Sequence, residues 1–432
     1  MKSNGESIKI IEENDLCISC GACTHICPFD NILMNYNTYR GKYDAVVQEE
    51  ELCLQCNGFK NCLAVCPSYN VNYEELASSS DNGYLGKIHN VYNGYAQDEE
   101  KRVKASSGGF IRQLSQTLLQ NKEIDGIISI THDKGLDYTP KIITDVENMP
   151  NSIYHNIDYE NAINLLNENK GKYLLVGLPC QITSIEQLSN KKKYLHLKER
   201  IYAKVALICG YTFDRTNMEF FSSMNAFKMD SISYRESGRY RKTRLRSDEK
   251  SILFDVYNPK TIAERINNSL MFDKLLPQKH CLYCVDHLGY CADIVVGDAW
   301  QKKYIKDKKG TNIIIARTDK GDKVIKSVNK FVFEEGSQDD IFQSQHQYAT
   351  PFMALSVAKA NVFDDTFVTE HIVTKTEKIR HTKLSFLNKV KIKYIKVLLR
   401  KRQFRLARVV YIMIESRVLI KILIKSILGK KI

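Results

Sequence analysis

Cysteines dominate the chemistry that this 432-residue chain could perform. Eight of them form two runs near the N-terminus, and each run closes on a Cys-Pro pair. The first run reads C-x2-C-x2-C-x3-C-P, and the second repeats it with a longer gap between its second and third cysteines. The runs are Cys17, Cys20, Cys23 and Cys27, then Cys53, Cys56, Cys62 and Cys66. Thiolates at this spacing let a short loop wrap one face of an iron–sulfur cluster, so the chain is predicted to move electrons.

The spacing is that of bacterial two-cluster ferredoxins, in which the fourth cysteine of each run crosses to the other cluster. One 4Fe–4S cluster would then be held by Cys17, Cys20, Cys23 and Cys66, and the second by Cys53, Cys56, Cys62 and Cys27. The alternative is structural zinc, which needs only four ligands, usually as two separated C-x2-C pairs. Eight cysteines in two matched runs favour the clusters. A disulfide framework is typical of small secreted domains, whereas this chain is long and charged residues interrupt its first apolar stretches. We expect a reducing cytoplasm.

The charge of the chain is concentrated at its C-terminal end. The formal net charge is +13, and residues 375–432 carry 18 Lys/Arg against two Glu, so that residues 1–374 have a net charge of −3. The apolar fraction of 43% is sufficient for packed cores. A near-neutral body without an aromatic-rich recognition module argues against a nucleic-acid partner.

Residues 375–432 are predicted to form a basic amphipathic helical tail. At about 100° per residue, four basic side chains share one side and several apolar ones share the other. The basic set is Lys389, Lys393, Lys396 and Arg400, and the apolar set is Leu387, Val390, Tyr394 and Leu398. No run reaches the roughly 20 apolar residues that span a bilayer. We expect the tail to lie on an anionic membrane surface at the cytoplasmic face. The alternatives are a helical hairpin docked on the body or on a partner subunit, and nucleic acid.

Between these ends, short apolar runs alternate with amphipathic stretches, which is typical of an α/β or α+β body. Strands are predicted at 124–130, 172–177 and 201–209, with helices at 110–119 and about 181–188. The polar, turn-rich segment 78–83 ends the ferredoxin domain, which we place at 1–80.

The body carries four further marks. Ser106-Ser107-Gly108-Gly109 precedes a helix, where free backbone N–H groups can cradle a phosphate; an ordinary N-cap and turn is the plainer interpretation. Cys180 follows a buried strand within Gly177-Leu178-Pro179-Cys180-Gln181. Three closely spaced cysteines, Cys281, Cys284 and Cys291, need a fourth ligand, for which Cys180 and Cys209 are the candidates. Arg317-Thr318 ends a strand as a phosphate clamp or an exposed strand end.

Taken in order, these marks resemble the beta subunit family of coenzyme F-420 hydrogenases and dehydrogenases. The matching residues are Ser106–Gly109, Gly177–Gln181, Ile208-Cys209-Gly210, Tyr234-Arg235, Cys281, Cys284, Cys291, Ala292-Asp293 and Gly297-Asp298-Ala299-Trp300. The resemblance covers roughly residues 85–345, with the ferredoxin as an N-terminal addition. It divides the body into an N-terminal, flavin-binding region at 85–165 and a C-terminal region at 166–360 that carries a third iron–sulfur site.

The resemblance implies FAD near Ser106, Ser107, Gly108, Gly109, Pro179, Gln181 and Asp298. It also implies a third 4Fe–4S cluster on Cys281, Cys284 and Cys291, with Cys180 as the fourth ligand. A catalytic or packing role for Cys180 is the alternative, and Cys209 is expected in the core. No residue stands out as a general acid or base.

The chain is therefore predicted to be an iron–sulfur flavoprotein oxidoreductase. It would take electrons from a ferredoxin or a partner oxidoreductase, passing them through FAD to a diffusible substrate, with membrane-proximal polysaccharide biosynthesis as the setting. The alternative is an electron-transfer subunit of a larger complex, with no substrate site of its own.

Overall fold

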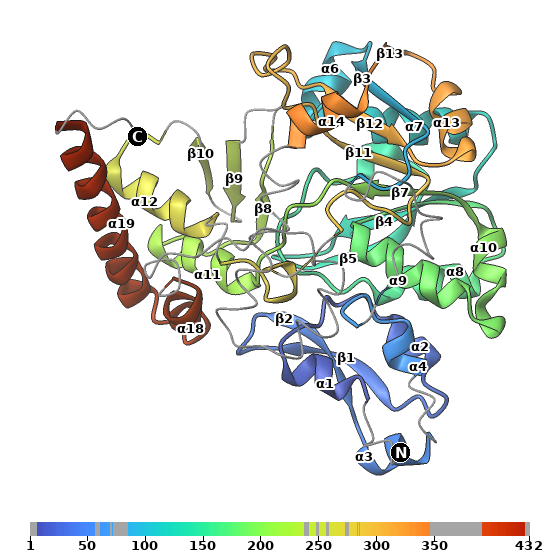
Figure 1. Cartoon of the computed structure of the whole chain (residues 1–432), viewed down its shortest axis with the longest axis horizontal. Helices are drawn as coiled ribbons and strands as arrows, with labels where there is room; N and C mark the ends of the chain where they lie inside the picture. Colours follow the sequence, from blue (N-terminus) through green and yellow to red (C-terminus); the bar gives the residue numbers. More distant parts are fainter. Residues whose placement is uncertain are drawn as a thin grey trace.

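Three β-sheets organise the computed structural model (Figure 1). It describes residues 7–56, 61–69, 71, 85–236, 242–247, 250–255, 259–272, 276–282, 284, 286–345 and 391–427. A two-stranded sheet lies in the N-terminal lobe, an eight-stranded sheet forms the body, and a three-stranded sheet lies beside the C-terminal helices. The predicted class, a ferredoxin followed by a mixed α/β body and a helical tail, is confirmed. The predicted boundary at 78–83 lies outside the described residues.

The large sheet has the order β13-β3-β12-β11-β7-β6-β4-β5. Its strands are β3 (Asn90–Ala96), β4 (Gly126–His132), β5 (Tyr138–Ile143), β6 (Tyr173–Gly177), β7 (Ile201–Leu207), β11 (Ile294–Asp298), β12 (Asn312–Ala316) and β13 (Phe331–Glu335). The central strands β4, β6, β7 and β11 are parallel, whereas the outer pairings are antiparallel. The three predicted strands correspond to β4, β6 and β7.

Helices cover both faces of this sheet. Successive side chains of a strand point to opposite faces, so each central strand contributes apolar residues to both cores. On one face, Leu174 and Val176 pack against α7 (Phe110–Gln120) and α13 (Asp319–Lys326). On the other face, Leu175 packs in a core that includes four helices. These are α8 (Glu160–Glu168), α9 (Pro179–Ser189), α10 (His196–Arg200) and α14 (Gln338–Gln345). The helices predicted at 110–119 and 181–188 are α7 and α9. The short helix α6 (Glu99–Lys104) follows β3.

The N-terminal lobe is small and built around its cysteines. Its elements are α1 (Lys9–Glu13), α2 (Ala22–Ile26), β1 (Ile32–Asn37), β2 (Lys42–Val47), α3 (Glu50–Gln55) and α4 (Asn61–Ala64). Its own core joins Ile8, Ile11 and Leu16 to the cysteine side chains. The opposite surface of the lobe, however, belongs to the core of the body, which contains Cys20 and Ala22 together with α9 residues. The lobe is therefore packed against the body.

Hydrogen bonds join the lobe to the loop before α8. The backbone N–H of Tyr159 donates to the carbonyl of Ser19 (2.9 Å), and the Asn156 amide donates to the Ser19 hydroxyl (2.7 Å). The side-chain carbonyl oxygen of Asn156 accepts from the backbone N–H of Tyr43 (2.9 Å). Ser19, Asn156 and Tyr159 are all buried, so the junction excludes water.

A third packed unit surrounds the small sheet of β8 (Ser231–Ser233), β9 (Lys242–Arg246) and β10 (Ser251–Asp255). Its core joins α11 (Arg215–Met224) and α12 (Ile262–Met271) to the C-terminal helices. Those are a π-helical turn at Lys391–Ile395, α18 (Lys396–Arg400) and α19 (Phe404–Ile427). Figure 1 shows α19 along the outer edge of the molecule, beside α12.

Residues 395–414 of the tail pack on the body, as the helical-hairpin alternative proposed. Ile395 and Leu399 are fully buried, whereas Tyr394, expected on the apolar side, is mostly exposed. Lys393 is exposed and Leu398 partly buried, as predicted, whereas Tyr394 and Lys396 lie on the opposite sides from those predicted. The π-helical turn at Lys391–Ile395 shifts the register that a regular 3.6-residue period assumes. Residues 375–390 lie outside the described residues. In the described ranges no helix is both long and apolar enough to cross a membrane.

Buried carboxylates explain why two predicted surface cations face inward. Arg400 contacts both Asp214 (2.9 Å) and Asp15 (2.7 Å), and Lys396 contacts Asp214 (3.4 Å). Burial raises the pKa of Asp15, but Lys42, Arg400 and Lys396 outweigh it and hold that pKa well below its usual value. Asp214 has no solvent exposure, so its charge requires these cations. The pairs fix the tail to the lobe and to α11.

We predict that Asp214→Asn lowers the free energy of unfolding by about 3 kcal/mol, because it leaves Lys396 and Arg400 without their shared buried partner. Urea unfolding followed by circular dichroism measures the change. Arg402→Ala is the matched control: it removes the partly exposed pair with Glu219 (3.0 Å) and should cost under about 1 kcal/mol. Equal effects of the two substitutions would contradict the buried-pair account.

Candidate metal centres

The first predicted cluster site is a cavity lined by four cysteines. Cys17, Cys20, Cys23 and Cys66 all border it, together with apolar side chains such as Ile11 and Met34. Gly21, in the left-handed conformation (φ 75°), turns the loop between two of these cysteines, and a Cβ there would lie 2.4 Å from the Glu160 side chain. The crossed set predicted from the spacing is thus brought together.

Burial sets the protonation of these thiols. It raises the pKa of Cys17 to about 12, although Lys42 acts in the opposite direction. Burial also raises the pKa of Cys23 and Cys66, and neighbouring cysteines in the set raise both further. Without a metal these groups therefore favour the neutral thiol. As thiolates in an apolar cavity they would need a cationic partner, and iron is the partner that this donor set fits.

The second predicted site lies at the outer end of the lobe. Burial raises the pKa of Cys56, and Cys27 and Cys53 add to the rise. Burial likewise raises the pKa of Cys62. Two backbone hydrogen bonds lower that pKa in part, and Cys53 and Cys27 raise it further. Asn31 donates its backbone N–H toward the Cys27 sulfur (3.4 Å) and its amide toward the Cys53 sulfur (3.7 Å). These four side chains also form the crossed set.

A third group of cysteines forms at one edge of the large sheet. Cys180 follows the carboxyl end of β6, and Cys209 follows that of β7, its parallel neighbour. Burial raises the pKa of Cys180, and the nearby Cys284, Cys209 and Cys281 raise it further. The loop that carries Cys281 is held by Thr212, whose backbone N–H points to the sulfur (3.4 Å). Four thiols therefore share one electrostatic environment.

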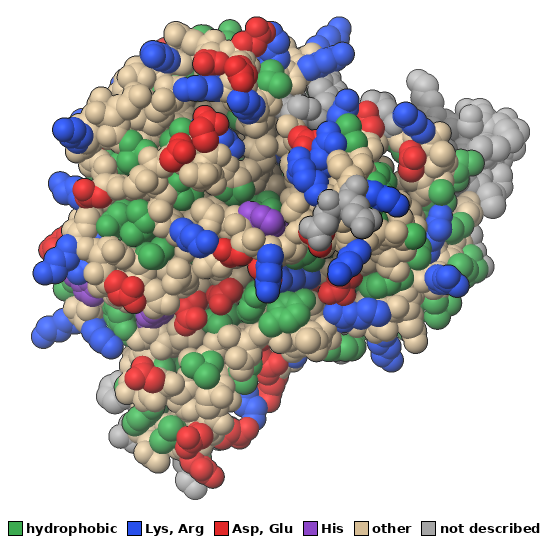
Figure 2. Space-filling view, turned by 180° about the vertical axis from the view of Figure 1, so that it is seen from behind, with side chains coloured by type: hydrophobic (Ala, Val, Ile, Leu, Met, Phe, Trp, Pro, Cys, Tyr) green, Lys and Arg blue, Asp and Glu red, His purple; other side chains and the backbone are tan. Residues whose placement is uncertain are grey.

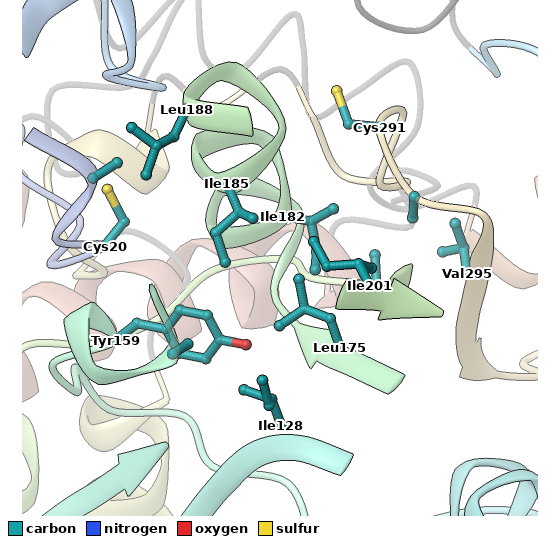
Figure 3. Close-up of a cluster of buried hydrophobic side chains, with 14 of the residues drawn as sticks. Cys20, Ile128, Tyr159, Leu175, Ile182, Ile185, Leu188, Ile201, Cys291 and Val295 are labelled. Carbon is teal, nitrogen blue, oxygen red and sulfur yellow. The ribbon is translucent and has the colours of Figure 1, made fainter. Parts of the chain in front are cut away.

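Cys291 lies elsewhere. It precedes β11, so it sits at the amino end of a strand that runs parallel to β7. Burial raises its pKa to about 12; the next largest influences on that pKa come from Asp286, Thr183, Lys204 and Glu186, none of them a cysteine. Figure 3 shows Cys20 and Cys291 on opposite sides of α9.

The sequence held a signal for Cys209 that the prediction did not use. Parallel neighbouring strands place their carboxyl ends at one edge of a sheet, where α/β proteins form their sites. Cys209 ends the predicted strand 201–209, and Cys180 comes three residues after the predicted strand 172–177. The sequence of each strand does not show which strand it pairs with. The parallel pairing of β6 with β7, which brings the two cysteines to one edge, comes from the structure.

The residues predicted to bind FAD largely serve the fold. The Ser107 hydroxyl donates to the Thr311 carbonyl (3.0 Å), and Ser106 accepts from the Ser152 N–H (2.9 Å). A Cβ at Gly108 would lie 2.6 Å from the Gly94 carbonyl oxygen, so this glycine allows close strand packing. Gly109 (φ 84°) begins α7.

Pro179, Gln181 and Asp298 have comparable roles. Pro179 is the first residue of α9, and Gln181 accepts from the Leu178 N–H (2.7 Å) to cap that helix. Asp298 accepts two hydrogen bonds from Arg235, at 2.8 and 3.1 Å. These contacts give all seven residues a place in the fold, and a flavin site on them stays a prediction. Beside Gly109, however, a small cleft is lined by Lys101, Lys104 and Arg112.

Arg317 is neither a clamp nor an exposed strand end. It is buried, and its guanidinium donates to the carbonyls of Leu85 (3.0 Å), Lys87 (2.7 Å) and Leu288 (2.7 Å). Thr318 caps α13 by accepting from the Gly321 N–H (2.9 Å). Both residues hold the structure together.

We propose that Cys180, Cys209, Cys281 and Cys284 hold the third cluster, with Cys209 in the place that the prediction gave to Cys291. Within the described ranges no three His, Cys, Asp or Glu side chains converge as a single metal ion requires. A cubane instead bonds each thiolate to a different iron atom, so its ligands stand further apart.

We predict that Cys209→Ser reduces iron from about twelve to about eight atoms per chain, because the third cluster loses a ligand. Cys291→Ser, the matched control, should keep all of the iron. Iron analysis after anaerobic purification decides between them. Loss of iron in Cys291→Ser with retention in Cys209→Ser would restore the original assignment.

Comparison with known proteins identifies the domains that carry these sites. Residues 16–70 match the 4Fe-4S dicluster domain. Residues 91–153 match the N-terminal model, and residues 170–340 the C-terminal model, of the coenzyme F420 hydrogenase/dehydrogenase beta subunit. Together the last two cover more than half of the chain.

Individual relatives are distant. The chain is 20% identical over 322 residues to a subunit of the F(420)H(2) dehydrogenase of Methanosarcina mazei, covering 69% of this chain and 81% of that protein. A solved chain of the F420-reducing [NiFe] hydrogenase complex of Methanosarcina barkeri superposes with a TM-score of 0.48 at 18% identity. The superposition covers 70% of this chain and 99% of that one. With both family models matched in order behind a dicluster domain, the chain belongs to the coenzyme F420 hydrogenase/dehydrogenase beta subunit family.

Proposed function

We propose that this chain is an electron-transfer subunit of a larger oxidoreductase complex. The observation that carries the proposal is the position of α9 between two cysteine groups. Cys180 lies in its first turn, and Cys20 of the ferredoxin lobe packs in the same core as Ile182 and Ile185 of this helix. Clusters held by these groups would supply one-electron carriers; the protein positions them and excludes water.

A second connection links the same two groups. The Ser68 hydroxyl lies 2.8 Å from Nδ1 of His280, and both side chains are buried. Ser68 is two residues from Cys66, and His280 precedes Cys281. The single hydroxyl hydrogen of Ser68 goes to the Leu16 carbonyl (2.8 Å), so Nδ1 of His280 is the donor to Ser68. Burial, helped by Lys42, lowers the pKa of His280 to about 3, which keeps the ring neutral.

The outer end of the lobe is where a redox partner would dock. The second cysteine set lies there, and Cys53 and Cys56 are partly exposed. Leu54, between them, is 67% exposed, and Phe29 is also exposed. Acidic residues surround this end: Glu49, Glu50 and Glu51 are all exposed. Figure 2 shows acidic and hydrophobic side chains prevailing on this lower lobe. The charge favours a partner with a basic rim over a free acidic ferredoxin.

The relatives support the subunit character. The M. mazei relative is named as a subunit of a dehydrogenase, and the family models describe a beta subunit. We therefore place the alternative function ahead of the predicted stand-alone reductase. Polysaccharide biosynthesis stays outside the proposal, since no contact among the described residues and neither relative points to it.

Electron exchange at the acidic end can be tested with small charged oxidants. We predict that the triple variant Glu49→Lys, Glu50→Lys, Glu51→Lys, once reduced, is oxidised about tenfold more slowly by hexaammineruthenium(III) and faster by ferricyanide at low salt. Stopped-flow absorbance of the clusters measures both rates. High salt should remove the differences.

The control is a second triple variant on the edge strand β13 and the start of α14: Glu334→Lys, Glu335→Lys and Asp339→Lys, all exposed. It changes the net charge equally and should leave both rates near those of the unmodified chain. If the two variants behave alike, electrons do not leave through the acidic end.

A FAD-dependent reductase is the second candidate function. The cleft beside Gly109, lined by Lys101, Lys104 and Arg112, has the charge that a dinucleotide pyrophosphate needs. We predict roughly 0.1 flavin per chain or less in acid extracts of the anaerobic protein without partners. About one FAD per chain, lost in Arg112→Gln, would instead favour the reductase.

A further inference from the structure

The long C-terminal helix α19 is apolar on more than the face that the body covers. Of its 24 residues, 16 are apolar, five are Lys or Arg, and one is Glu. A helix that is apolar all round is normally buried. Over residues 404–414, whose side chains the structure describes, only one side of the helix packs on the protein.

The covered side joins the third packed unit. Ala407, Tyr411 and Ile414 are buried, and they belong to the core that includes α11 and α12. Their spacing, four and three residues apart, is that of one helical face. This face explains why the tail docks on the body. It does not explain the apolar residues on the other side of the helix.

The opposite side exposes a second apolar stripe. Leu406 is 51% exposed, Val409 is 51% and Met413 is 54%. These residues are three and four positions apart, so they also share a face. Lys401 is exposed just before this helix, and Arg405 is exposed in its first turn. Figure 1 places α19 at the outer edge of the molecule, and Figure 2 shows hydrophobic and basic side chains together along that edge.

We propose that this face of α19 binds an anionic lipid surface. Lipid offers acyl chains to Leu406, Val409 and Met413, and phosphates to the cations beside them. Residues 401–414, which carry the stripe, contain four Lys/Arg and no Asp or Glu, a charge that repels a second copy of the same face. The helix would lie in the membrane interface, with its long basic side chains reaching the headgroups. Helical periodicity alone would have put Arg400 and Lys396 at the lipid. In the structure both form ion pairs with Asp214 instead.

The test is flotation of the full chain with lipid vesicles. We expect binding to vesicles of phosphatidylcholine with phosphatidylglycerol, weaker binding in high salt, and little binding to phosphatidylcholine alone. The triple variant Leu406→Glu, Val409→Glu, Met413→Glu should bind at least about tenfold less. Because the three side chains are about half exposed, the variant should keep its circular dichroism and iron content.

A matched control carries the same three charges elsewhere. Leu253, Ile262 and Ile305 are also exposed apolar residues, and replacing each with Glu should leave vesicle binding intact. A second variant, Lys401→Glu with Arg405→Glu, keeps the apolar stripe and should lose the preference for anionic vesicles. It distinguishes a lipid surface from unfolding of the helix.

Two outcomes would overturn the proposal. One is equal flotation of the unmodified chain and the α19 triple variant, or flotation of neither. The other is a dimer, detected by light scattering without vesicles, that the triple variant abolishes, since a second copy would then cover the stripe. Neither outcome affects the electron-transfer proposal, which is tested by iron, flavin and oxidation rates.

Discussion

The packing of α9 between two cysteine groups is the constraint on which the rest of the structure depends. Its inner residues, including Ile182 and Ile185, fill the core over β6, while its first turn supplies Cys180. The ferredoxin lobe reaches the same helix through Cys20. Any shift of α9 would change the sheet core and both cysteine environments together. The positions of the thiols are therefore set by ordinary apolar packing.

On the other side of the lobe, buried ion pairs rather than apolar packing hold the segments in place. Asp15, Asp214 and the cations Lys42, Lys396 and Arg400 come from the lobe, the body and the tail. None of these buried charges is stable alone, because desolvation is costly without a partner. The three segments are thus specified relative to one another by complementary charge, at a junction where apolar packing would allow several arrangements.

Local pattern predicted much of this molecule. The cysteine spacing predicted that Cys17, Cys20, Cys23 and Cys66 lie together, and they line one cavity. Hydrophobic runs predicted β4, β6, β7, α7 and α9 near their observed bounds. The remainder depended on pairing between distant segments. Cys209 joins Cys180 only because β6 and β7 are neighbours, and Asp298 meets Arg235 across 63 positions. Arg400 points inward because it pairs with the carboxylate of Asp214, 186 residues away in the sequence. Helical periodicity cannot predict such a distant partner.

The shared core of lobe and body bears on how the protein is made. Cys20, Ala22 and Val65 lie among the residues that cover the sheet, and four cysteines surround a cavity just behind them. A chain that has not received iron has nothing to fill that cavity or to tie its loops. Iron starvation would therefore leave an incompletely folded chain, open to proteolysis, rather than a stable protein that waits for its metal. Folding of the lobe against the body would thus depend on the supply of iron.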